Sequence, residues 1–452
     1  MRKLFITTCL SGVFFLLSLN QVQAQTNPAL GNEEGTRLFK AIKLAQATLQ
    51  TEVDTQKSDS TYKAVTVTSK KAALPVKLAL WQKDTDQLLY LTGKKTSKLV
   101  TLDDNKTYTI KIKLDNGVNS QYEVKGEPAA YVVAVIHPIF QSIGTRKKPK
   151  FKLENVVYVP YHDYLNIAAI INEGKTYFND KINAVYSELT SLGVKSHAYP
   201  NKLLAEVIDP VLIKSIIAIE HVGAIKQDSA AVTQYLNKFY VTLATNRHFS
   251  FAYAASAASA RGIAQFIPST YKLIVKSHPE LVLNKNFEQG MVDPYNAIKA
   301  AVGLLDDNLS KLPQTMKDAA QNDDKKIGAY LAAGYNGGIT RVIKAFNQWG
   351  EDWASDRTAK RTLYKKQEQA YLAQVKQIKK QLAVKKISKA QKTKLELELK
   401  TAKAQVQTAT RAYQLASRYN LKPETVYYVS KYHKVYDSLA SESQAYVAVA
   451  SN

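Results

Sequence analysis

Glu220 is the residue of this chain whose type and setting best suit acid chemistry. It follows VLIKSIIAI at positions 211–219, a stretch that is almost wholly apolar. Asp209 and Pro210 are typical of a helix start, because aspartate caps the first turn and proline suits the first helical position. A carboxyl at the buried end of such a helix is expected to have a raised pKa, since desolvation disfavours its charged form. Glu220 is therefore a candidate general acid, although a solvated glutamate at a helix end would fit the same pattern.

Four later segments contain short motifs of small, polar and aromatic residues. Their sequences are SAASARGIAQFIPST at 256–270, DPYNAI at 293–298, LAAGYNGGITRV at 331–342 and PETVYYVSK at 423–431. Together with IAIE at 217–220, and in this order, they resemble the motifs of the soluble lytic transglycosylase family, within the goose-type lysozyme-like superfamily. The resemblance covers residues 205–350 and 420–440. It implies an all-α lysozyme-like catalytic domain over residues 205–440.

The resemblance also implies an activity. Members of this family cleave the β-1,4 bond between N-acetylmuramic acid and N-acetylglucosamine in peptidoglycan glycan strands, and they leave 1,6-anhydromuramoyl ends. A single glutamate, here Glu220, would act first as acid and then as base, without a cofactor. Most glycosidases instead use two carboxylates, so a hydrolytic muramidase of the same fold would need a second acid, for which Glu424 is the candidate. A non-catalytic protein that binds or assembles cell wall is the other alternative.

Six residues match substrate-binding positions of the family: Ser256, Gln265, Tyr335, Asn336, Glu424 and Tyr428. The resemblance implies that Gln265 hydrogen-bonds the sugar, that Tyr335 lies near the catalytic carboxyl, and that Asn336 fixes the turn beside it. Ser256 would orient the substrate N-acetyl group or a bound water. Glu424 would line the cleft, although an acid directly after proline also suits a helix start.

The chain departs from the family pattern around these motifs. His221 stands where serine is usual. Ala264 and Ile267 replace methionines, which reshapes the wall that would face the sugar. Glu220 and Ser256 are separated by 35 residues, many more than in the family. This extra stretch is aromatic and basic in part and is expected to cover the cleft.

Residues 358–418 have no counterpart in the family core and contain two apolar series at helical spacing. The series are Tyr371, Val375, Ile378 and Leu382, then Leu395, Leu399, Ala402, Val406, Ala409, Tyr413 and Ala416. Such spacing forms a stripe for a partner helix, and Ser388 is a candidate cap for the second helix. The pattern predicts an inserted, antiparallel helical hairpin of the coiled-coil type.

The predicted hairpin is strongly basic. Positions 358–411 contain 15 basic and three acidic residues, a net charge of +12. The charge indicates either an ordinary solvated surface or an arm for an anionic wall polymer or an acidic protein partner. Specific nucleic-acid binding is not indicated, because few aromatic side chains are interleaved with the lysines.

The N-terminus predicts export. Arg2 and Lys3 precede a mostly apolar stretch at 4–19. Val22, Gln23 and Ala24 then fit the small-x-small pattern of a signal-peptide cleavage site, so residues 1–24 are interpreted as a signal peptide. We therefore expect a periplasmic, secreted or cell-wall-associated protein. No later stretch is apolar enough for a membrane span, so no integral membrane segment is expected after signal removal. Cys9 is the chain's only cysteine, so disulfides and cysteine chemistry are excluded from the mature protein.

The polarity and periodicity of the remaining sequence divide it into four segments. Residues 25–60 are polar and predict a flexible lead-in. Residues 61–160 alternate in short runs and predict a small β-rich domain, with a strand at 107–114 running into a turn at 115–117. A helical connector at 161–204 and a tail at 441–452 complete the prediction.

Neither the histidines nor Asp293 predict a further functional site. The seven histidines are scattered and none pairs with another at ligand spacing, so no metal site is predicted. Asp293 precedes Pro294 and is interpreted as a helix cap rather than a catalytic group.

Overall fold

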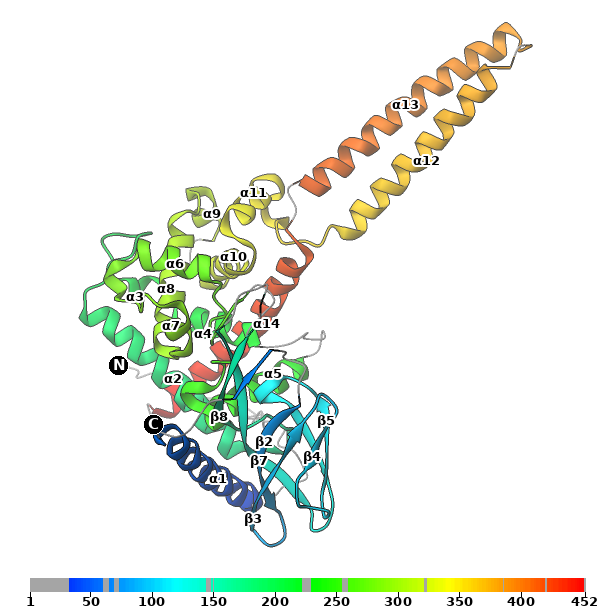
Figure 1. The fold of residues 1–452 in the computed structure, drawn as a ribbon. Coiled ribbons are helices and arrows are strands. Elements are labelled where there is room, and N and C mark those ends of the chain that lie inside the picture. Colours follow the sequence, from blue (N-terminus) through cyan, green and yellow to red (C-terminus); the bar gives the residue numbers. More distant parts are fainter. Residues whose placement is uncertain are drawn as a thin grey trace, which may run out of the picture.

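The structure, a computed structural model, describes residues 32–59, 65–68, 73–143, 148, 150–221, 229–253, 259–320, 323–384, 386–418 and 421–450. The predicted signal peptide lies outside these ranges. An antiparallel sheet region, residues 66–158, is followed by a helical region, which confirms the predicted two-part layout (Figure 1). Within the described ranges, no helix has the length and apolar character that a membrane crossing requires.

The sheet region is one eight-stranded antiparallel sheet in the order β1-β8-β7-β2-β3-β4-β5-β6. Its strands are β1 (Thr66–Val67), β2 (Leu74–Gln82), β3 (Leu88–Lys95), β4 (Leu99–Leu102), β5 (Thr109–Leu114), β6 (Gln121–Lys125), β7 (Ala130–Ser142) and β8 (Phe151–Tyr158). The sheet curls until β6 also contacts β7. Its inner face therefore encloses a core of its own, built from side chains such as Leu78, Ile110 and Tyr122.

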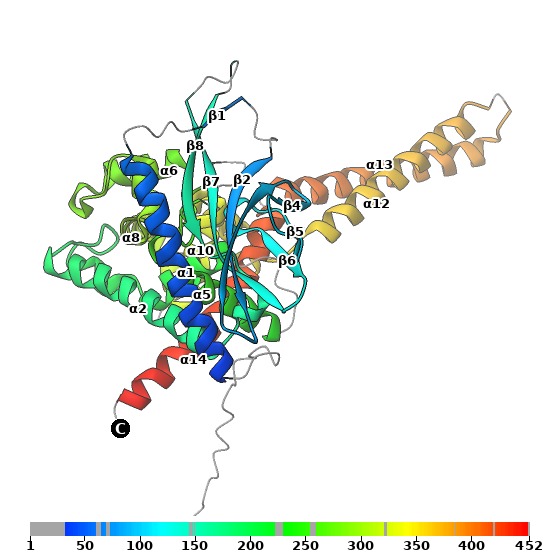
Figure 2. The same cartoon turned by 60° about the horizontal axis from the view of Figure 1, so that its bottom comes forward.

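Helix α1 (Asn32–Ser58) covers the outer face of the sheet over β7 and β8 (Figure 2). The prediction of a flexible lead-in over 25–60 is wrong for these residues. Leu38, Ile42, Leu49 and Val53 are at most 1% exposed and lie on one face, against the sheet. A single apolar stripe on an otherwise polar helix is enough for docking, and it left only a weak periodic signal in the sequence.

The helical region surrounds α8, most of whose side chains are buried. Its helices are α2 (Ala168–Ser191), α3 (Leu204–Val207), α4 (Pro210–His221), α5 (Ser229–Asn246), α6 (Pro268–Ser277), α7 (Phe287–Val292), α8 (Pro294–Ser310), α9 (Gln314–Ala319), α10 (Asp324–Gly337), α11 (Ile339–Trp349) and α14 (Pro423–Ala450). Helix α2 packs on α5 and α8, so the predicted connector at 161–204 is part of the helical core. Helix α14 continues to Ala450, so the predicted tail at 441–452 begins as helix.

Helices α12 (Thr358–Leu382) and α13 (Lys389–Arg418) lie side by side and project away from the rest of the molecule (Figure 1). Ile378, Ala402, Ala409 and Ala416 are buried between them. The backbone amide of Gln391 donates to Oγ of Ser388 over 3.2 Å, which caps the first turn of α13. Helix α14, which follows, packs on α4 and α10, so the chain returns to the helical region after α13.

The two regions are joined through Asn246 at the end of α5. The Asn246 side chain accepts a hydrogen bond from the Val159 amide (2.8 Å) and donates one to the Val159 carbonyl (3.0 Å). Tyr158 donates to the carbonyl of Ser250 (2.6 Å). The end of β8 therefore holds the segment after α5 in place.

Candidate functional site

Glu220 lies in the last turn of α4, as its sequence setting predicted. Asp209 caps this helix, accepting a 2.9 Å hydrogen bond from the Val211 amide. Ile213, Ile216 and Ile217 are fully buried in the core. The apolar helix thus carries the Glu220 carboxyl to a half-buried position at the edge of the core.

Two residues of α14 face this carboxyl. The phenol of Tyr428 donates a 2.7 Å hydrogen bond to Oε1 of Glu220. Burial raises the pKa of Glu220 to about 7, against the hydrogen bond from Tyr428 and the positive charge of Lys431, which both lower it. Burial also lowers the pKa of Lys431, whose Nζ lies 5.5 Å from the centre of the Tyr428 ring. The site therefore holds a carboxyl that exchanges a proton near neutral pH: burial favours its protonated form, and Tyr428 and Lys431 favour its charged form.

A tight turn at residues 261–266 forms the next part of the site. Its ends pair through the Arg261 amide and the Phe266 carbonyl (3.0 Å). Gly262 has a φ of +72°, and a Cβ there would lie 2.1 Å from the Met291 carbonyl oxygen, so only glycine fits. Gln265 also has a positive φ, of +48°, and its Nε2 donates to the Gly262 carbonyl over 2.8 Å. The Gln265 side chain is thus held within the turn.

Two aromatic side chains fix the carbonyls of this turn relative to Glu220. Tyr335, near the end of α10, donates its hydroxyl proton to the carbonyl of Ala264. His221 donates from Nε2 to the carbonyl of Ile263 over 2.7 Å. Burial lowers the pKa of His221 to about 4, so its ring is neutral at physiological pH. Burial raises the pKa of Tyr335 well above its usual value, and the negative charge of Glu220 adds to this rise, so the phenol lies within the field of that carboxyl.

The other predicted site residues differ in their placement. Asn336 accepts a 2.9 Å hydrogen bond from Oγ1 of Thr425, which joins the end of α10 to the start of α14. Glu424 is 65% exposed and pairs with Lys422 over 3.3 Å. Ser256 lies outside the described residues. Asp293 accepts a 3.0 Å hydrogen bond from the Tyr295 amide and caps α8, which confirms its prediction as a helix cap.

Two residues of the site were not among the predicted site residues. Lys431 lies three positions after Tyr428, within the closing motif, so its spacing on the helix carried the signal. His221 stood out only as a departure from the family's serine. Its contact with Ile263 depends on a turn 42 positions away, which no local pattern reveals.

A family model, the transglycosylase SLT domain, matches residues 232–356. The chain therefore carries an SLT domain. The matched stretch contains the turn at 261–266 and Tyr335, whereas Glu220 and Tyr428 lie outside it and are brought to it by α4 and α14. No curated protein and no solved structure matches the chain. The SLT domain supports a lytic transglycosylase type of function that acts on peptidoglycan.

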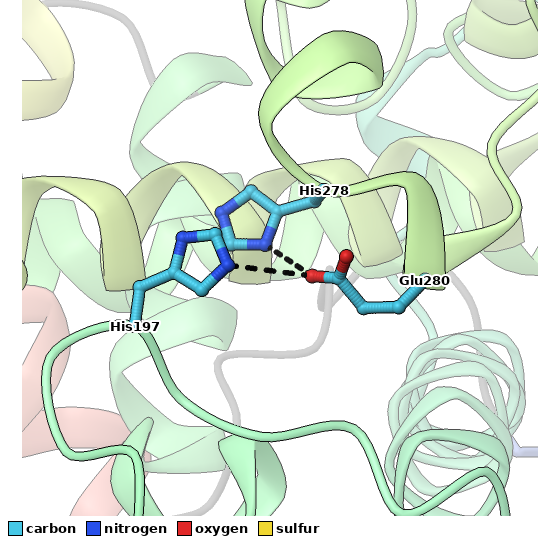
Figure 3. Close-up of side chains that lie close together, drawn as sticks. All are labelled: His197, His278 and Glu280. Atoms are coloured by element: carbon cyan, nitrogen blue, oxygen red, sulfur yellow. Dashed lines mark hydrogen bonds and ion pairs between the residues drawn. The ribbon is translucent and has the colours of Figure 1, made fainter.

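A second polar cluster brings together two histidines that have no ligand spacing in the sequence, where no metal site was predicted. His197, His278 and Glu280 each place one ligand atom within 4.8 Å of the others (Figure 3). They come from the segment after α2, the end of α6 and the 3₁₀ helix Pro279–Leu281. The sequence separation of 81 positions between the histidines concealed this cluster.

Proposed function

We propose that this protein is a peptidoglycan lytic transglycosylase in which Glu220 is the acid and base. The observation that carries the proposal is the half-buried Glu220 carboxyl, with a pKa of about 7 and a hydrogen bond from Tyr428, beside an SLT domain. A carboxyl with such a pKa keeps its proton available at neutral pH and also accepts one readily.

The reaction uses both states of Glu220. The protonated carboxyl gives its proton to the oxygen that links C1 of N-acetylmuramic acid to N-acetylglucosamine, and the C1–oxygen bond breaks. The substrate's N-acetyl group supports the electron-poor C1 centre. The C6 hydroxyl then attacks C1 and gives its proton to the Glu220 carboxylate, so the acid is regenerated and no water is consumed. Tyr428 and Lys431 stabilise the carboxylate between these steps, because each favours the charged form of Glu220.

Use of one carboxylate favours this reaction over hydrolysis. Among the described residues, Lys431 is the charged group that shifts the pKa of Glu220. No carboxylate of these residues shifts that pKa. Glu424, the candidate second acid, is exposed and paired with Lys422. A hydrolase needs a base that activates water on the opposite face of the sugar, and Glu424 is poorly placed for that role.

Substrate contacts are assigned to the turn at 261–266 and its neighbours. Gln265 retains its Oε1 for a sugar hydroxyl, since Nε2 is the atom that binds Gly262. Ser256, Tyr335, Asn336, Glu424 and Tyr428 complete the proposed substrate-binding set.

The hairpin of α12 and α13 is proposed as an arm that binds an anionic wall polymer. Its net charge of +12 over 358–411 is carried by side chains that are mostly exposed. At 30 residues, α13 is about 45 Å long, so the arm reaches well beyond the helical region. Export by residues 1–24 would place the protein in the periplasm or at the cell wall, where such polymers are found.

Product analysis tests the proposed reaction. Purified sacculi digested with the mature protein should release muropeptides with anhydro ends, each one water lighter than the corresponding reducing-end product. Reducing ends instead would identify a hydrolytic muramidase. Binding to sacculi without release of either product would identify a non-catalytic wall protein.

A further inference from the structure

The cluster of His197, His278 and Glu280 lies at the far end of α6 from the turn at 261–266. Oε1 of Glu280 lies 2.8 Å from Nδ1 of His278 and 3.6 Å from Nε2 of His197. One nitrogen of each imidazole ring points toward the same carboxylate oxygen of Glu280 in Figure 3. Helix α6 has ten residues and is about 15 Å long, so the cluster is separate from the Glu220 site.

The opposite nitrogens of both rings face one further carboxylate. Oδ1 of Asp307, on α8, lies 3.0 Å from Nε2 of His278 and 3.3 Å from Nδ1 of His197. The other oxygen of Asp307 accepts a 3.0 Å hydrogen bond from Ser277. A neutral ring that keeps its proton on the nitrogen facing Asp307 presents its other nitrogen to Glu280 as an acceptor, and both rings are placed to do this. Metal-binding histidines in proteins commonly donate their second ring nitrogen to a carboxylate in this way.

These tautomers leave an electrostatic problem at Glu280. The Nδ1 lone pair of His278, the Nε2 lone pair of His197 and the Glu280 carboxylate then converge, and all three are acceptors. Such a set is stable only if a proton or a metal cation lies between them. Two imidazole nitrogens and one carboxylate are ligands that Zn²⁺ prefers. We propose that His197, His278 and Glu280 bind one Zn²⁺ ion, with Asp307 orienting both rings.

The surroundings fit a site with three protein ligands. A surface pocket of about 560 Å³ is lined by His197 and Glu280 and gives a water molecule access to a fourth ligand position. His278 is fully buried, so its position is fixed. The rings are stacked, with centres 3.9 Å apart and planes 10° apart. A metal bound in the plane of both rings requires one ring to turn, and His197, on an exposed segment, is the ring free to do so.

Zinc at this position would fasten the segment 192–203 to the end of α6. This segment leads from α2 to α3 and α4, the helix that carries Glu220. Bound metal therefore stabilises the fold near α4 without taking part in the proposed glycan cleavage, and the inference stands whether or not that reaction is correct.

The test uses the mature chain without a histidine tag, freed of metal by a chelator and then dialysed. Zinc chloride is titrated in by calorimetry, and bound zinc is counted by mass spectrometry of the metal. We expect one Zn²⁺ per chain with a dissociation constant at or below about 10 µM, and a rise in Tm on binding. His197→Ala and Glu280→Gln should weaken binding at least tenfold and abolish the rise in Tm. Asp307→Asn should weaken it by about 10- to 100-fold.

A matched control separates this cluster from adventitious binding. His248 is exposed and lies in the 3₁₀ helix Arg247–Phe249, away from the cluster, so His248→Ala should bind zinc as the wild type does. Absence of stoichiometric zinc from the wild type would overturn the proposal and leave a protonated His278 as the group that bridges the carboxylates. Equal binding by His197→Ala and the wild type would also overturn it, since the zinc would then lie elsewhere.

Discussion

The hydroxyl of Tyr428 donates a 2.7 Å hydrogen bond to Oε1 of Glu220, and this contact joins residues 208 positions apart. It brings α14, which follows the basic hairpin, onto the last turn of α4. The SLT match at 232–356 contains neither residue. The acid of the proposed site is therefore completed by parts of the chain on both sides of the matched domain.

The pH dependence of cleavage follows from the pKa of Glu220. The reaction begins with the protonated acid, so the rate should fall as pH rises through about 7. Lys431 lowers this pKa by its charge, so Lys431→Met should raise the pKa and move the fall in rate to higher pH. Pseudo-first-order rates of sacculus solubilisation between pH 5 and 9 measure this effect. Lys434→Met, which removes a lysine three positions further along α14 that does not shift the pKa of Glu220, is the control and should leave the profile in place. A profile unmoved by Lys431→Met would contradict the assignment of Glu220 as the acid.

Stability should also depend on pH through Glu220. Its pKa is raised from 4.5 to about 7 on folding, so the wild type loses stability as pH rises through that interval, because the unfolded chain ionises more readily. Glu220→Gln removes this penalty. We expect the variant to exceed the wild type by less than about 1 kcal/mol at pH 5 and by up to about 2 kcal/mol at pH 8, since the carboxyl is only half-buried. Thermal unfolding at both pH values gives the difference. The same difference at pH 5 and pH 8 would contradict a raised pKa.

Docking of the sheet region should depend on Asn246. Asn246→Ala leaves the amide and the carbonyl of Val159 without their buried partners, and each such group costs about 1–3 kcal/mol. We expect a fall in Tm of several degrees and earlier proteolysis within 246–253. Asn201→Ala, at an exposed position, serves as the control and should leave Tm unchanged. Equal Tm values for both variants would show that the sheet region is held by other contacts.

Binding of the hairpin to an anionic polymer is tested by removing positive charges from it. Five exposed lysines are replaced with glutamine, which keeps the helices: Lys376, Lys379, Lys380, Lys400 and Lys403. Sacculus binding in low salt should weaken severalfold, and its dependence on salt should decrease. The control replaces five exposed lysines of the sheet region: Lys94, Lys98, Lys106, Lys111 and Lys125. Equal losses in both variants would indicate a general charge effect and refute a specific arm.

Local sequence patterns predicted those parts of the molecule that local forces determine. The apolar stretch before Glu220 and the caps at Asp209 and Asp293 were visible because helix starts and buried faces depend on neighbouring residues. The alternation at 107–114 likewise predicted a strand, which is β5 at Thr109–Leu114, and Gly117 adopts the positive φ expected of the turn that follows.

Features that depend on distant partners were not predicted. Helix α1 is stabilised by the sheet on which it lies, and its own sequence is mostly polar. The pairing of His197 with His278 depends on how the segment after α2 crosses the end of α6. The contact of His221 with Ile263 depends in the same way on the turn at 261–266. In each case the tertiary fold supplies the partner, so composition and spacing contained at most a weak signal.

The most direct test of the account is digestion of purified sacculi by three proteins: the wild type, Glu220→Gln and Glu424→Gln, with products identified by mass. Anhydromuropeptides are expected from the wild type and from Glu424→Gln. Glu220→Gln should lose at least about 1,000-fold in rate but should still bind sacculi. Anhydro products from Glu220→Gln at a rate near that of the wild type would contradict the central claim, because another group would then supply the proton.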